Sequence, residues 1–69
     1  MVNHLKNNKM KTEIIYKELK DKIENNLVNL NQKLRKHQKD FEQNPTNWGF
    51  VGDIEYINNK LDEITDFLK

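Results

Sequence analysis

The sequence predicts an all-α protein, an antiparallel helical hairpin in which a long helix is followed by a shorter one. Two observations lead to this fold class. Apolar residues recur at helical spacing along two separate stretches, and a break rich in turn-forming residues, 44–53, lies between them. A strand would place its apolar residues at every second position, and neither stretch does so.

The chain begins with a basic segment. Residues 1–11 contain three Lys and no acid, with few apolar side chains to bury. We therefore expect a flexible N-terminal tail over 1–11 and a helical hairpin domain over 12–69. Thr12 is a candidate N-cap for the long helix, and Glu13 would lie in its first turn, where the helix dipole favours a negative charge.

The long helix is predicted over about residues 12–42, with a length of about 45 Å at ~1.5 Å per residue. Its apolar positions fall within about 80° of one another at ~100° per residue. These positions are Tyr16, Leu19, Ile23, Leu27, Leu30, Leu34, His37 and Phe41. Pro45 should end the helix, because Pro lacks an amide donor and disfavours helical backbone at Asn44.

The short helix is predicted over about residues 53–68, or about 24 Å of helix. Gly52 would relax the backbone before it, and Asp53 is a good N-cap. Its apolar residues follow an unbroken heptad spacing, which is typical of nearly parallel packing in bundles and coiled coils. They are Ile54, Ile57, Leu61, Ile64 and Leu68.

The unequal lengths of the two helices predict self-association. A short helix that folds back would end near Leu27 and leave the first half of the long stripe uncovered. The residues expected to make this contact are Ile14, Ile15, Tyr16, Leu19 and Ile23. Two hairpins packed as a four-helix bundle, a homodimer, would be the simplest closed solution. The composition agrees, because a chain of 69 residues without Cys has no disulfide to stabilise a small core.

Charge is distributed unevenly along a chain whose net charge is +1. Residues 1–39 carry ten Lys and Arg against four acids, whereas residues 40–69 carry two Lys against seven acids. The two halves could attract each other, or the basic half could contact nucleic acid. The residues for the second interpretation are Lys33, Arg35, Lys36 and Lys39. A single Arg and the lack of interleaved aromatic residues argue against base recognition.

The sequence offers little to catalysis. Ser and Cys are absent, and no Thr has a His within helical reach. His4 and His37 are too far apart for a helical zinc site, so we expect no metal and no cofactor, and His37 is predicted to pack or to cap a helix. The acidic residues Asp62, Glu63 and Asp66 are interpreted as a solvated helix face.

A binding function is therefore predicted rather than an enzyme: a small protein-interaction module, adaptor or inhibitor, that self-associates through its long helix. Trp48 and Phe50 are the candidate partner-binding residues, although Trp48 could instead cover the end of the hairpin core. A nucleic-acid-binding regulator is the alternative. Neither a signal peptide nor a membrane-spanning run is apparent, so we expect a cytoplasmic protein with no membrane contact.

Overall fold

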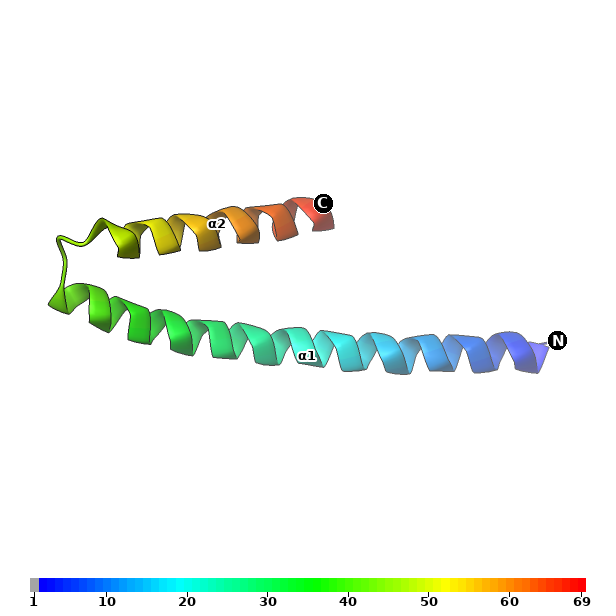
Figure 1. Ribbon diagram of the computed structural model, residues 1–69. Helices are drawn as coiled ribbons and strands as arrows, with labels where there is room; N and C mark the ends of the chain where they lie inside the picture. Colours follow the sequence, from blue (N-terminus) through cyan, green and yellow to red (C-terminus); the bar gives the residue numbers. More distant parts are fainter. Residues whose placement is uncertain (1) are drawn as a thin grey trace. The chain divides into compact units, whose positions relative to one another are not determined.

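A computed structural model describes residues 2–69, with side chains described from residue 9 onward. Two helices follow each other, α1 (Val2–Gln43) and α2 (Trp48–Leu68), and no strand occurs among the described residues (Figure 1). The all-α class and the two-helix order are thus confirmed. The chain divides into two compact units, Met1–Lys33 and Leu34–Lys69. The first contains α1 as far as Lys33, and the second is a helical hairpin made of the last turns of α1, a tight turn and α2.

Helix α1 begins ten residues earlier than expected, at Val2 rather than Thr12. Residues 2–11 contain neither Gly nor Pro, so no helix-breaking residue prevents the helix from extending toward the N-terminus from Thr12. The predicted flexible tail over 1–11 stays a prediction, because Met1 and the side chains of residues 1–8 lie outside the described residues.

Pro45 ends α1 as predicted, and the last helical residue is Gln43. The chain then turns through two backbone hydrogen bonds. The amide of Asn44 donates to the carbonyl of Phe41 at 2.9 Å, and the amide of Asn47 donates to the carbonyl of Asn44 at 3.1 Å. These bonds satisfy backbone groups that the end of a helix would otherwise leave unpaired.

Helix α2 begins at Trp48, and the predicted start at Asp53 is wrong. Asn47 is the N-cap: its backbone is extended, with φ −85° and ψ 107°, and its side-chain Oδ1 accepts a hydrogen bond from the amide of Gly49 at 2.9 Å. Asn and Asp are comparable N-caps, so residue type does not favour Asp53 over Asn47. Asn47 comes first after the turn, and the helix begins directly behind it. Asp53 consequently lies inside α2, where its carboxylate is free for another role.

Burial within the second unit is partial. Its half-buried side chains are Leu34, His37, Phe41, Phe50, Val51, Ile57 and Leu61. Among the described side chains, from residue 9 to the end, none is fully buried. A folded domain of this length usually stabilises itself by removing apolar surface from water, so the described helices still have apolar surface to cover.

Neither helix, over its described residues, combines the length and the apolar character needed to cross a lipid bilayer.

Candidate interaction surfaces

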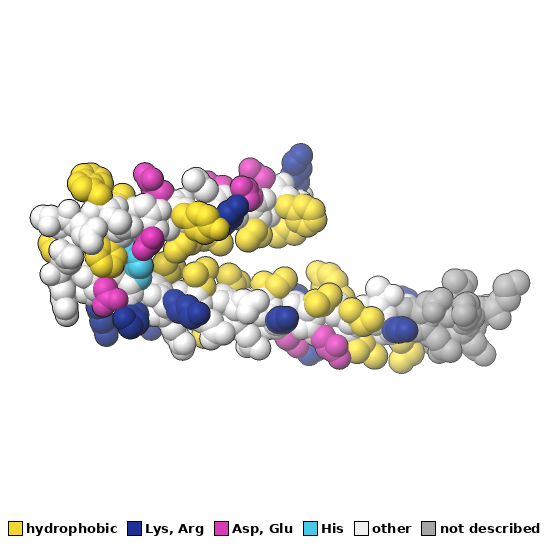
Figure 2. Space-filling view, in the orientation of Figure 1, with side chains coloured by type: hydrophobic (Ala, Val, Ile, Leu, Met, Phe, Trp, Pro, Cys, Tyr) yellow, Lys and Arg dark blue, Asp and Glu magenta, His cyan; other side chains and the backbone are white. Residues whose placement is uncertain are grey.

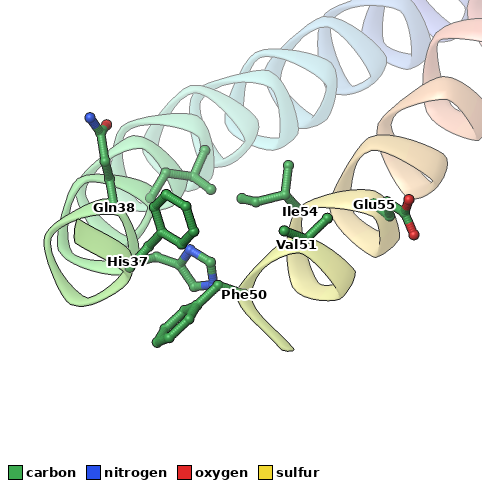
Figure 3. A pocket seen from close by; sticks show the side chains of 8 residues that line it. His37, Gln38, Phe50, Val51, Ile54 and Glu55 are labelled. Carbon is green, nitrogen blue, oxygen red and sulfur yellow. The ribbon is translucent and has the colours of Figure 1, made fainter. Parts of the chain in front are cut away.

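The second unit carries an apolar groove of about 460 Å³. We call it the hairpin groove. It is lined by Leu34, His37, Gln38, Phe41, Phe50, Val51, Ile54 and Glu55. Figure 3 shows His37 and Phe50 turned toward each other, with Val51 and Ile54 entering from α2, while Gln38 and Glu55 point outward. The groove is therefore apolar inside with a polar rim, which is the usual arrangement of a binding surface.

Three rings organise the hairpin groove. The ring centroids of His37 and Phe50 are 5.2 Å apart at an interplanar angle of 77°, and those of Phe41 and Phe50 are 6.1 Å apart at 72°. Both pairs are edge-to-face contacts, each worth about 0.5 to 1.5 kcal/mol beyond the area that they bury. Phe50 therefore packs the start of α2 against the last turns of α1.

A polar contact joins the same two segments. Nε2 of His37 lies 2.9 Å from Oδ2 of Asp53. The His37 side chain is 22% exposed, whereas that of Asp53 is 63% exposed. Water screens the carboxylate at this exposure, so the pair adds modestly to stability and mainly fixes the imidazole orientation. His37 packs as predicted, and Asp53, which was expected to cap a helix, is its partner.

Trp48 borders a second hollow of about 450 Å³ at the turn, with Phe41, Pro45 and Val51 among its neighbours. Its side chain is nevertheless 80% exposed. The interpretation of Trp48 as a cover for the core is therefore wrong. The reason is geometric: at ~100° per residue, Trp48 and Phe50 point to nearly opposite sides of α2. Of the two candidate partner-binding residues, one faces solvent and the other faces the hairpin.

The long helix carries the surface predicted for self-association, which we call the α1 stripe. All five of its residues are exposed: Ile14 56%, Ile15 46%, Tyr16 69%, Leu19 58% and Ile23 56%. Leu27 continues it at 49%. Figure 2 shows hydrophobic side chains recurring along this part of α1. At ~100° per residue, Tyr16, Leu19, Ile23 and Leu27 fall within about 80° of one another, whereas Ile14 lies about 180° from Ile23. The face formed by the first four is exposed, apolar and at helical spacing, which is typical of a helix that meets a partner.

The basic residues Lys33, Arg35, Lys36 and Lys39 are all exposed. Nζ of Lys36 forms an ion pair with Oδ2 of Asp40 at 3.0 Å, one turn further along α1. Part of the local positive charge is therefore neutralised within the helix, which weakens the attraction for a polyanion.

Candidate metal ligands do not gather in the described part of the chain: no group of three or more His, Asp or Glu side chains could hold an ion there. Asp62, Glu63 and Asp66 are exposed on α2. Comparisons with protein-family models, curated proteins and solved structures find no match.

The sequence indicated part of the apolar lining of the hairpin groove but not the contribution of the first turn of α2. Phe41 and Ile54 were expected on the two stripes, whereas Val51 and Phe50 were assigned to a loop. Once Asn47 is taken as the N-cap, the heptad spacing of α2 extends back to Phe50 and the signal becomes readable. The Asp53 contact had no separate signal in the sequence.

Proposed function

We propose that this chain is a small, non-catalytic protein-interaction module of the cytoplasm, an adaptor or inhibitor, that self-associates through the α1 stripe. The observation that carries the proposal is the exposure of five large apolar side chains over two and a half turns of α1, between 46% and 69% each. Full burial of one such side chain stabilises a protein by about 1.5 to 3 kcal/mol. Covering Tyr16, Leu19, Ile23 and Leu27, which share one face of α1, would thus contribute as much as the whole stability expected of a small domain.

A second copy of the chain is the simplest cover. In a twofold dimer the same patch of each chain contacts its copy on the other chain, so an apolar stripe on one chain packs against an equally apolar stripe. The heptad spacing of α2, and of α1 from Leu27 to Phe41, suits the nearly parallel packing of a four-helix bundle. The hairpin end, with the hairpin groove and Trp48, would remain available to a target protein.

The test is molar mass by light scattering with the substitution Ile23→Asp. The wild type should have the mass of two chains at micromolar concentration, and Ile23→Asp should dissociate or unfold it, because a buried unpaired carboxylate is costly. Asn25→Asp adds the same charge on the opposite side of α1 and should leave the mass unchanged. A monomeric wild type with full helical circular dichroism would refute the proposal.

The alternative is a nucleic-acid-binding regulator that uses Lys33, Arg35, Lys36 and Lys39. Their common exposure favours it, and the Lys36–Asp40 ion pair weakens it. Fluorescence anisotropy with a DNA duplex decides between the two. Phosphate contacts would fall steeply with salt and would be lost in Lys36→Glu, whereas docking on a protein would withstand moderate salt.

A further inference from the structure

The apolar face of α1 that a second copy would cover is nearly symmetric about its middle. It consists of Tyr16, Leu19, Ile23 and Leu27, which are 69%, 58%, 56% and 49% exposed, and we call it the pairing face. Helix α1 runs through it without a break (Figure 1). When the order is reversed about a midpoint between residues 21 and 22, Tyr16 comes opposite Leu27 and Leu19 opposite Ile23. The pairing face can therefore meet its copy in the antiparallel or the parallel direction, and apolar burial alone does not choose.

Two opposite charges border the pairing face on one side. At ~100° per residue, Lys20 lies about 55° and Glu24 about 95° from the middle of the face, in the same direction. Neither forms an ion pair with a described side chain, although they are one turn apart. Lys17, farther from the face, instead pairs with Asp21 at 3.2 Å. Lys20 and Glu24 thus occupy the flanking positions whose charges set partner and orientation when two helices pair.

In an antiparallel pair, each border faces the same border of the second copy. Reversal about the midpoint places Lys20 within about two residues, or ~3 Å along the axis, of Glu24 of the second copy. Twofold symmetry forms this contact twice. Lys22, about 105° from the middle on the other border, would approach its own copy. The antiparallel pair therefore has two attractive contacts against one like-charge contact.

In a parallel pair, each border would face the opposite border of the second copy. That opposite border holds Ile15, Lys22 and Asn26, and it has no acid between residues 11 and 33. Lys22 would then lie near both Lys20 and Glu24 of the second copy. Its repulsion by the first offsets its attraction to the second, so charge gives the parallel pair no net support.

We propose that two copies of this chain pair through their α1 helices in the antiparallel direction, with Lys20 of each copy against Glu24 of the other. The proposal rests on the proposed self-association and adds the orientation and the residues that select it. Each ion pair lies at the exposed rim of an apolar contact, so it contributes less to affinity than to the choice between the two directions, and salt screens it.

The orientation can be measured as the distance between nitroxide labels in the full chain carrying Lys33→Cys. The chain has no Cys and Lys33 is exposed, so each copy takes one label. In the antiparallel pair the two labelled positions are about 35 Å apart along the axis at ~1.5 Å per residue. In a parallel pair they would lie within about 20 Å, because packed helices are ~8 to 10 Å apart. The shorter distance at a two-chain mass would overturn the orientation alone, and a monomeric mass would refute both proposals.

Charge reversal tests the residues that select the orientation. Lys20→Glu and Glu24→Lys should each weaken the dimer about tenfold in a light-scattering dilution series, because two attractive contacts become repulsive. An equimolar mixture of the two variants should regain the wild-type affinity, since each chain then offers the charge that the other needs. Lys17→Glu is the matched control: it also places an acid one turn before an acid, Asp21, but away from the pairing face, and should leave the mass unchanged.

Circular dichroism on every variant checks that the helices are retained. A mixture that stays as weak as its two components would overturn the proposal. So would a Lys17→Glu variant that dissociates as readily as Lys20→Glu, because the loss would then come from charge within the helix and not from the second copy.

Discussion

The two glycines of α2 should respond differently to the same substitution. Gly49 lies in the first turn and Gly52 in the second, both within a helix that begins at Trp48. A Cβ added at Gly52 would meet nothing within 4 Å apart from its chain neighbours and the helix's own backbone, whereas one added at Gly49 would lie 3.0 Å from Oδ1 of Asn47. That oxygen is the N-cap acceptor, so Gly49→Ala crowds the group that starts the helix.

The magnitudes follow from these positions. Ala in place of Gly inside a helix is worth about 0.5 to 1 kcal/mol, because Gly loses more backbone entropy on folding. Gly52→Ala should gain this amount. Gly49→Ala gains it as well but disturbs a cap worth about 0.5 to 2 kcal/mol, so its net effect should lie between about 0.5 kcal/mol of stabilisation and about 1.5 kcal/mol of destabilisation, below that of Gly52→Ala.

Thermal unfolding followed by circular dichroism separates the two variants. A difference of 1 kcal/mol corresponds to about 4 to 8 °C in Tm for a domain of this size. All proteins must be compared at one concentration, because the Tm of an oligomer depends on it. If Gly49→Ala stabilised the chain as much as Gly52→Ala, Asn47 would not be the N-cap and the start of α2 at Trp48 would be wrong.

Two further predictions test the hairpin. In a urea titration, Phe50→Ala should lower the free energy of unfolding by about 1 to 3 kcal/mol, less than the loss of a fully buried Phe. Trp48→Ala should change it by no more than ~0.5 kcal/mol, because its side chain is exposed. A larger loss for Trp48→Ala than for Phe50→Ala would show that Trp48, and not Phe50, packs in the hairpin. A double-mutant cycle with His37→Ala and Asp53→Ala should give a coupling of about 0.2 to 1 kcal/mol, and additive effects would show that their 2.9 Å contact is energetically silent.

The elements that could be predicted from sequence are those fixed by local rules. Tyr16 to Phe41 keep a helical period, and Pro45 removes a backbone donor, so the class and the end of α1 follow directly. The start of α2 could not be chosen in the same way. Asn47 and Asp53 are equally good caps by residue type, and the choice depends on the turn that precedes Trp48.

Helical periodicity was enough to predict the two amphipathic helices, their order and the apolar positions of the α1 stripe, because a periodic pattern can be recognised without knowing what the helix contacts. The packing of the hairpin was needed to show that Trp48 faces solvent, that Phe50 packs on Phe41 and that His37 meets Asp53. Residues 48–52 were assigned to a loop, and a loop pattern does not predict where a side chain points. Because α2 begins at Trp48, five residues before the expected cap, helical geometry fixes the directions of these side chains.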